Sequence, residues 1–261
     1  MSKRPEGWQG WDAYAPFYDW ENARTLGRRD VAFWKKVAAG VDGDLIELGC
    51  GTGRLLVPMA RARDGQGLTI GVDRSAPMLE RARRRVRRLP VALRPLLIRG
   101  DVRTWPFRPR RFKAVIAAYG LLQSLVRDVD MNATLDAAAA NLSRGGLFAI
   151  DLVPDLSAWD EYERRVPLRG RLSAGTTLTL VESVRQDRRK GLTIFDEQYV
   201  VRSGRKVQKH QFQLTFRTLP MAEVLARLDT AGFRIDDVQG GYRGEVWHPE
   251  ADTWVILARK R

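Results

Sequence analysis

The chain has 261 residues, of which 44% are apolar and 29% are charged, and its formal net charge is +14. This length and composition are typical of one globular domain, or of one domain with an insertion. No run of about 18 apolar residues is present, so we expect no transmembrane helix and no membrane partner. Residues 1–10 are polar and Cys50 is the only cysteine. We therefore expect no secretory signal, no internal disulfide and a cytoplasmic location.

The positive charge is mostly arginine, because only eight of the 45 basic residues are lysine. Basic surfaces attract phosphate, so a nucleic-acid partner is one interpretation. The densest run, 81–88, overlaps an apolar stripe at helical spacing, formed by Met78, Leu79, Ala82, Val86 and Leu89. Its arginines would then occupy the solvent face of an ordinary helix. We favour a general bias toward arginine and keep nucleic acid as the alternative.

An aromatic segment over 8–20 precedes a region in which helices and strands alternate. The hydrophobic pattern predicts, in chain order, a helix over 28–39, a strand over 45–48, a helix over 54–63, a strand over 68–72, a helix over 76–89, strands over 96–98 and 114–118, a helix over 131–142 and a strand over 147–152. Such alternation predicts a parallel sheet with helices on both faces.

The pattern changes after residue 155. Three segments with strand character, 176–184, 192–201 and 206–216, are joined by hairpin signals. A helix over 221–231 then precedes strands over 233–238 and 254–258. We therefore expect an α/β fold with a Rossmann-like, seven-stranded, mostly parallel sheet and an antiparallel β insertion after strand 5. Its expected parts are an N-terminal aromatic lid and helical segment (1–40), a main domain (41–155 and 219–261) and the insertion (166–218).

A glycine-rich turn, Glu47-Leu-Gly49-Cys50-Gly51-Thr-Gly53, follows the first strand. Glycines permit a tight turn and let a ligand approach the backbone closely. A dinucleotide-binding turn would need a third glycine at position 54, which is Arg54, and a phosphate-binding loop would need Gly-Lys-Ser or Gly-Lys-Thr. Both phosphate sites are therefore excluded, and a clamp for a ligand without pyrophosphate fits the spacing better.

Two aspartates follow the next two strands. Asp73 lies where a carboxylate can accept hydrogen bonds from ribose hydroxyls. Asp101 could accept an adenine amino group while the Val102 N–H meets a ring nitrogen. Either aspartate alone could simply cap a helix. The turn and both aspartates stand at consecutive carboxyl ends of strands, however, and that is where open α/β sheets bind ligands.

These motifs resemble those of the class I S-adenosylmethionine-dependent methyltransferases. The turn is similar to their first motif, Val72-Asp73 to their second and Gly100-Asp101-Val102 to their third. The sequence Leu142-Ser-Arg-Gly-Gly-Leu-Phe148 is similar to the turn before their fifth strand, with Arg144 in place of the usual proline. The aromatic segment and the insertion look like those of small-molecule N-methyltransferases, such as the glycine and amino-sugar N-methyltransferases.

The resemblance implies S-adenosyl-L-methionine as the cofactor. By this resemblance, Glu47 and the glycines would hold the methionine end, Asp73 the ribose, and Asp101 with Val102 the adenine, while Arg28 or Arg29 would pair with the carboxylate. The full set of implied cofactor-binding residues is Arg28, Glu47, Gly49, Cys50, Gly51, Gly53, Asp73, Arg74, Met78, Asp101, Val102 and Ala118.

The candidate catalytic residues are Tyr14, Tyr18 and Gln123. The two tyrosines could face the cofactor's cation, with packing as the equal alternative. Gln123 lies in the loop after the fourth strand, where the resemblance implies a polar acceptor-side residue, although the histidine found there in some relatives is missing. The isolated His210 and His248 predict no metal site.

We expect methyl transfer to a small-molecule acceptor, an amine by the resemblance, through in-line displacement that depends on positioning more than on a base. An RNA methyltransferase is the alternative that the charge favours. The stretch 117–120 reads Ala-Ala-Tyr-Gly rather than Asn-Pro-Pro-Tyr, and no RNA-binding module is appended, so the sequence favours the small molecule. A non-catalytic binding protein with the same fold is the third interpretation. We expect a monomer or a homodimer.

Overall fold

The computed structural model describes residues 6–25, 29–153 and 161–261. Within these residues a seven-stranded sheet contains β1 (Leu45–Leu48), β2 (Thr69–Asp73), β3 (Leu96–Arg99), β4 (Phe112–Ala117), β5 (Leu142–Leu152), β10 (Phe233–Gln239) and β11 (Trp254–Lys260). Its strand order is β10-β11-β5-β4-β1-β2-β3. β11 runs antiparallel to both neighbours, and the remaining pairs are parallel. The predicted Rossmann-like, mostly parallel sheet is therefore confirmed.

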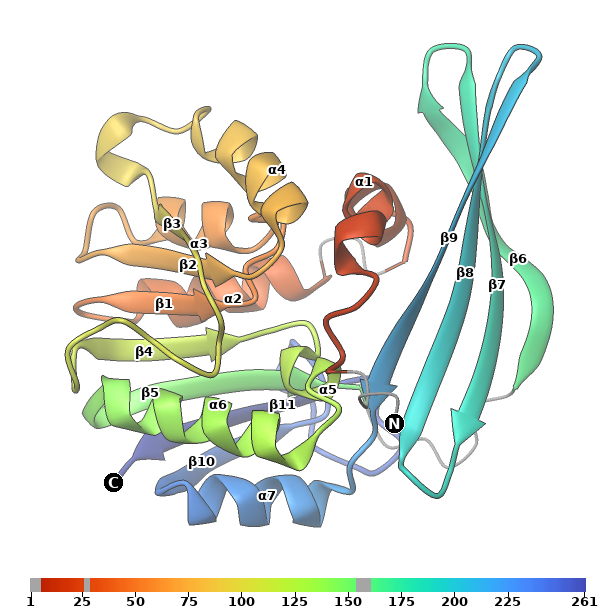
Figure 1. Ribbon diagram of the computed structural model, residues 1–261. Helices are drawn as coiled ribbons and strands as arrows, with labels where there is room; N and C mark the ends of the chain where they lie inside the picture. The colour runs from red at the N-terminus through yellow and green to blue at the C-terminus, as the bar shows by residue number, and fades with distance from the viewer. Residues whose placement is uncertain (1–5, 26–28, 154–160) are drawn as a thin grey trace.

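Helices cover both faces of this sheet (Figure 1). In chain order they are α1 (Trp11–Asn22), α2 (Arg29–Ala39), α3 (Leu56–Ala62), α4 (Ala76–Val86), the short 3₁₀ helix η1 (Val91–Leu93), α5 (Leu121–Ser124), α6 (Asp128–Asn141) and α7 (Met221–Thr230). Helices α6 and α7 pack on one face through residues such as Leu135 and Leu228. On the opposite face, α2 and α3 contribute Trp34 and Met59. Among the described residues, every helix is too short or too polar to cross a bilayer.

Helix α4 shows how the arginine-rich run is accommodated. Ser75 caps the helix by accepting a hydrogen bond from the Met78 backbone N–H at 3.3 Å, and a proline stands in the first turn. The predicted apolar stripe is buried from Met78 to Leu89, whereas the arginines between these positions are exposed or half-buried. The run therefore forms the outer face of a packed helix, as its spacing predicts.

A second sheet of four antiparallel strands follows β5 in the described part of the chain: β6 (Tyr162–Ser173), β7 (Thr176–Asp187), β8 (Leu192–Ser203) and β9 (Lys206–Arg217). The sequence pattern predicts only the last three. β6 is an edge strand that is exposed along nearly its whole length, so the alternation that marks a half-buried strand is missing. Its Pro167 also argues against a strand, although an edge strand tolerates proline. β6 begins at Tyr162, before the expected start of the insertion at residue 166.

Helix α1 lies between the main sheet and the insertion and joins them (Figure 1). Phe17 stacks on Tyr199 of β8 with ring centroids 4.2 Å apart. On the opposite side, Asp19 accepts a hydrogen bond from the Thr52 hydroxyl at 2.7 Å and pairs with Arg85 at 2.6 Å. The sequence indicates only an aromatic segment here, because a proline lies inside the helix and weakens the helical pattern.

Two buried carboxylates and one half-buried carboxylate lie where α1 meets the insertion. Glu182 and Glu197 are register partners on β7 and β8, and Glu21 accepts hydrogen bonds from the hydroxyls of Tyr14 and Tyr199. Burial, followed by the negative charges of Glu21 and Glu182, raises the pKa of Glu197 from 4.5 to about 9. Glu197 is therefore protonated in the folded protein at neutral pH.

Replacing Glu197 with glutamine is expected to change how stability depends on pH. Because its pKa is raised on folding, the contribution of Glu197 is fully present below about pH 4.5 and is lost as the pH rises toward about 9. Glutamine cannot ionise, so Glu197→Gln should be more stable than the parent by roughly 1–3 kcal/mol at pH 8. Urea denaturation across this pH range measures the difference, with the exposed Glu163→Gln as the control. Parallel pH profiles for Glu197→Gln and the parent would contradict the prediction.

Candidate functional site

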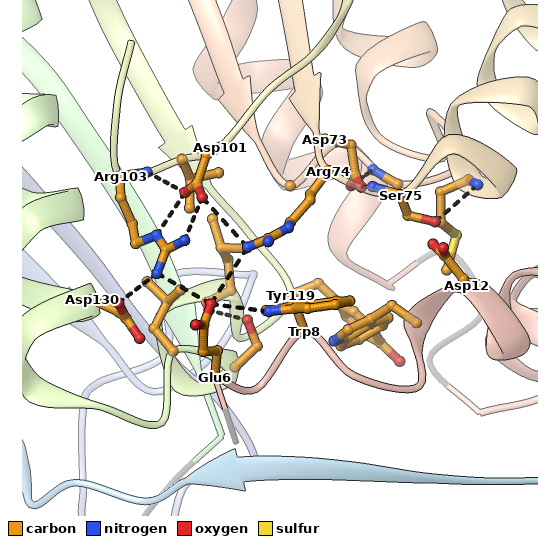
Figure 2. A pocket seen from close by; sticks show the side chains of 18 of the residues that line it. Glu6, Trp8, Asp12, Asp73, Arg74, Ser75, Asp101, Arg103, Tyr119 and Asp130 are labelled. Atoms are coloured by element: carbon orange, nitrogen blue, oxygen red, sulfur yellow. Dashed lines mark hydrogen bonds and ion pairs between the residues drawn. The ribbon is translucent and has the colours of Figure 1, made fainter. Parts of the chain in front are cut away.

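A cavity of about 310 Å³ opens at the carboxyl ends of β1 to β4. The strand ends contribute Gly49, Asp73 and Asp101, and α1 contributes Trp11 and Tyr18 on the other side. Figure 2 shows Asp101, Arg103 and Glu6 gathered at one end of the cavity, with Asp12 and Ser75 at the other. The three predicted strand-end elements therefore share one cavity rather than lying in separate surroundings.

The glycine-rich turn reaches the cavity through backbone rather than side chains. Gly49 and Gly51 both have positive φ angles, +62° and +52°, which glycine adopts without steric cost. Both line the cavity. Cys50 between them points the other way and packs with Leu56 and Leu79, and burial raises the pKa of its thiol well above the usual value. Cys50 is therefore a packing residue of the turn and not a nucleophile.

Asp73 fixes the turn to the second strand. Its Oδ2 accepts a hydrogen bond from the Gly51 N–H and its Oδ1 accepts one from the Ser75 N–H, both at 2.8 Å. Burial raises the pKa of Asp73, while these two N–H groups lower it. The carboxylate thus ties β1 to β2 and still faces the cavity, where its remaining lone pairs can accept from a ligand.

Asp101 belongs to a network of alternating charges. Its oxygens accept hydrogen bonds from Arg103 Nε at 2.9 Å and Nη2 at 2.5 Å, and Arg74 lies at 3.4 Å. Arg103 also donates to the buried Asp130 at 2.7 Å. The hydrogen bond from Arg103 is the main reason that the pKa of Asp101 is lowered. An adenine amino group would have to share this carboxylate with Arg103, a constraint that the sequence does not reveal.

Residues 6–10, which we call the strap, cross this end of the cavity before α1 begins. Glu6 lies within 3.4–3.7 Å of the guanidinium groups of Arg74, Arg103 and Arg127. It also accepts a hydrogen bond from the Trp8 indole at 3.0 Å, and Arg74 lies over the Trp8 ring at 4.3 Å. A Cβ on Gly7 would come within 1.7 Å of the Ser124 carbonyl oxygen, so the strap is seated closely.

A buried charged group lies behind the turn. Arg54 makes two parallel hydrogen bonds with Asp30 of α2, at 2.8 and 2.6 Å. Glu47 is also buried, and its Oε2 has no hydrogen-bond partner within the described residues. Burial raises the pKa of Glu47 well above its usual value, and the nearby Arg54 opposes this shift. An unpartnered buried carboxyl oxygen is unusual, and burial favours the neutral form of this group.

The three candidate catalytic residues lie in different parts of the structure. Tyr18 lines the cavity, and burial raises its pKa to about 12 although Arg54 opposes the shift. Tyr14 instead donates to Glu21 at 2.9 Å in the contact between α1 and the insertion. Gln123 faces away from the cavity, because its amide donates to the Val153 carbonyl and accepts from the Val153 N–H, at 2.9 and 2.8 Å. Neither Tyr14 nor Gln123 lines the cavity.

The implied cofactor-binding residues also divide into two groups. Those that line the cavity are Gly49, Gly51, Asp73, Arg74, Met78, Asp101, Val102 and Ala118. Glu47, Cys50 and Gly53 lie behind this lining, and Arg28 lies outside the described residues. The sequence reasoning missed Glu6, Asp12, Arg103 and Tyr119. Tyr119 had a visible signal, since it directly follows a strand end beside Ala118.

Residues 45–146 match a family model described as a methyltransferase domain. A demethylmenaquinone methyltransferase from Lactiplantibacillus plantarum is 34% identical over 116 residues, which cover 42% of this chain and 48% of the relative. A 2-phytyl-1,4-naphthoquinone methyltransferase from Synechococcus elongatus is 36% identical over 124 residues, which cover 45% of this chain and 52% of the relative. The chain thus spans about half the length of the curated relatives it matches.

Solved structures show a likeness that includes the insertion. A S-adenosylmethionine-dependent methyltransferase from Clostridium acetobutylicum matches with a TM-score of 0.75 and 16% identity, covering 95% of this chain and 98% of the other. A sugar N-methyltransferase from a Streptoalloteichus species matches with a TM-score of 0.73 and 17% identity, covering 94% and 93%. The prediction made from the motifs is confirmed for the fold: residues 45–146 match a methyltransferase domain, and the chain has the fold of the S-adenosylmethionine-dependent methyltransferases.

Proposed function

We propose that this protein transfers the methyl group of S-adenosyl-L-methionine to a small-molecule acceptor. The observation that carries the proposal is the convergence of the glycine-rich turn, Asp73 and Asp101 on one cavity. These elements come from three neighbouring strands, β1, β2 and β3. A backbone clamp followed by two carboxylates matches an extended nucleoside with an amino-acid tail.

The residues present fit this cofactor. The backbone of Gly49 and Gly51 lines the cavity and can receive the methionine end, whereas Glu47 lies behind this lining. Asp73 keeps lone pairs for ribose hydroxyls beyond the two backbone N–H groups it already accepts from. Val102 and Met78 supply apolar lining for the adenine. Asp101 stands at the same end but shares its oxygens with Arg103.

The bound cofactor supplies a methyl group already activated by a sulfonium charge. The chain's own task is therefore to orient the acceptor and exclude water. Trp8, Trp11 and Tyr18 form aromatic walls that can do both. Tyr18 stays protonated at neutral pH because its pKa is about 12, so it can hold an acceptor by hydrogen bonding but does not act as a base.

An amine is the acceptor that the site suits best. Asp12 of α1 lines the cavity and has no ion pair among the described residues, so its carboxylate can attract an ammonium group. Glu6, Asp101 and Asp130 also line the cavity, but arginines already pair with them. A neutral amine also needs no strong base, and neither described histidine lines the cavity. A naphthoquinol-type ring is the second candidate, because the aromatic walls suit a flat ring and the relatives named above act on quinones.

A transfer assay distinguishes these acceptors. Purified protein would be incubated with methyl-labelled S-adenosylmethionine and a panel of amino sugars, small amines, demethylated naphthoquinols and RNA. We expect label on an amine. If only the naphthoquinol is labelled, it replaces the amine as the proposed acceptor. If RNA is labelled and RNA binding is sensitive to salt, RNA replaces the small molecule as the proposed acceptor. Cofactor binding without transfer to any acceptor class would favour a non-catalytic binding protein.

Weakening the strap is expected to speed cofactor exchange. Glu6→Gln removes the ion pairs with three arginines, each partly exposed and worth a fraction of a kcal/mol. We expect S-adenosylhomocysteine to dissociate about three to ten times faster from this variant. Stopped-flow tryptophan fluorescence measures the rate. Glu80→Gln, which loses exposed pairs with Arg83 and Arg84 on α4, is the matched control; equal rates in all three proteins would contradict the role of the strap.

A further inference from the structure

Tyr119 has a backbone conformation that is rare for a residue with a side chain. Its φ is +59° and that of Gly120 is +62°, so two consecutive residues are left-handed directly after β4. Glycine adopts this conformation readily, whereas tyrosine must be held in it by its surroundings. Residues held in this way cluster at binding sites and active sites. Tyr119 also lines the cavity, next to Ala118.

Asp151 holds the backbone of this turn in its left-handed conformation. It lies near the end of β5 and is only 2% exposed. One carboxylate oxygen accepts a hydrogen bond from the Gly120 N–H at 3.0 Å, and the other accepts one from the Tyr242 hydroxyl at 2.7 Å. Because each oxygen has its own donor, the carboxylate cannot turn without losing one of them. Asp151 and Tyr242 therefore fix the turn that carries Tyr119.

The ring of Tyr119 is fixed from two further directions. The Arg54 guanidinium lies 5.1 Å from the ring centroid, and its pair with Asp30 holds it there. Tyr18 meets the ring edge-on, with centroids 5.9 Å apart. Figure 2 shows Tyr119 among the side chains that line the pocket. The aromatic ring is thus presented to the cavity in one defined orientation.

We propose that Tyr119 contacts the sulfonium end of the methyl donor and that Asp151 is the positioning residue that directs it there. This inference rests on the proposed function. The sulfur joins the ribose to the methionine chain, so a donor held by Asp73 and by the turn at Gly49 has its charge between them. Tyr119 borders that region from the neighbouring strand β4. An aromatic ring attracts a cation, and S-adenosylhomocysteine, the demethylated product, has lost that charge. The contact would therefore favour the donor over the product and help product release.

Calorimetry with S-adenosylmethionine and S-adenosylhomocysteine tests the contact without turnover. We expect the preference for the donor, expressed as the ratio of the two dissociation constants, to fall about fivefold in Tyr119→Leu. Tyr119→Phe keeps the ring and should keep the ratio. A ratio in Tyr119→Leu equal to that of the parent would overturn the inference. If neither ligand binds the parent, the proposed function fails instead, so the two failures are distinguishable.

The positioning role has its own readout. Asp151→Asn should lower the same ratio as Tyr119→Leu does, because an amide cannot accept from both donors. Combined with Tyr119→Leu, it should have no further effect on the ratio. A purely structural Asp151 would lower the unfolding midpoint but leave the ratio unchanged, which would overturn the positioning role. Tyr242→Phe removes only one of the two hydrogen bonds to Asp151. If Asp151→Asn does not fold, the ratio of the two dissociation constants is measured in Tyr242→Phe instead and should likewise fall.

Discussion

Replacing Asp73 with asparagine is expected to weaken the binding of S-adenosylhomocysteine by at least about 100-fold. The carboxylate accepts hydrogen bonds from both the Gly51 and the Ser75 N–H groups. An asparagine amide accepts at only one of these positions and presents an N–H₂ group to the other donor. The variant therefore loses the shape of the glycine-rich turn and an acceptor for the ribose hydroxyls together. Titration calorimetry measures the affinity.

Asp187→Asn is the matched control for this experiment. Asp187 also accepts a backbone hydrogen bond, from the Lys190 N–H at 3.3 Å, but it lies on the hairpin between β7 and β8 and does not line the cavity. We expect its affinity for S-adenosylhomocysteine to equal that of the parent. A loss of less than about threefold in Asp73→Asn, which is less than about 0.7 kcal/mol, would show that the carboxylate neither shapes the turn nor meets the ligand.

Removing Asp30 is expected to produce the largest loss of stability. The Asp30 side chain is completely buried and the side chain of Arg54 is only 10% exposed. Breaking a buried ion pair by removing one partner leaves an uncompensated charge, which costs about 3–5 kcal/mol. Asp30→Ala should therefore lower the free energy of unfolding by this amount, measured by urea denaturation. By contrast, Asp196→Ala breaks the exposed pair with Arg185 and should cost less than about 1 kcal/mol.

Replacing both members of the buried pair separates the charge effect from packing. Asp30→Leu combined with Arg54→Met removes both charges and keeps apolar volume, so much of the lost stability should return. The preference of the combined variant for S-adenosylmethionine over S-adenosylhomocysteine should nevertheless be reduced, because Arg54 also holds the ring of Tyr119. An Asp30→Ala variant as stable as the parent would show that Arg54 finds solvent or another partner.

The sheet could be predicted because its strands are covered on both faces. All four residues of β1 are buried, and β4 is buried at five of its six positions. Each strand therefore appears in the sequence as a short, mostly apolar segment, interrupted only by Glu47 in β1 and Lys113 in β4. Glycines and charged residues then mark the ends of the strands. The edge strand β6 is exposed and lacks this apolar pattern. Helix α1 was not predicted because Pro16 lies inside it and weakens the helical pattern.

The candidate site was predictable only where it depends on strand ends. Gly49, Asp73 and Asp101 follow predicted strands, and parallel strands bring such positions together. Tyr119 also follows a strand end, but the orientation of its ring depends on residues that are distant in the sequence: Asp151, which holds the Gly120 N–H, and Arg54, which lies over the ring. Gln123 shows the opposite case, since a polar residue in the expected loop is used to hold the Val153 backbone. Side-chain partners of this kind cannot be read from spacing alone.

A crystal structure with S-adenosylhomocysteine bound would show whether the strand ends form the cofactor site. We expect the ligand in the cavity at the ends of β1 to β4, with its ribose on Asp73, its amino-acid tail along Gly49 and Gly51, and its adenine toward Val102. A ligand bound elsewhere on the protein, with this cavity empty, would contradict this expectation.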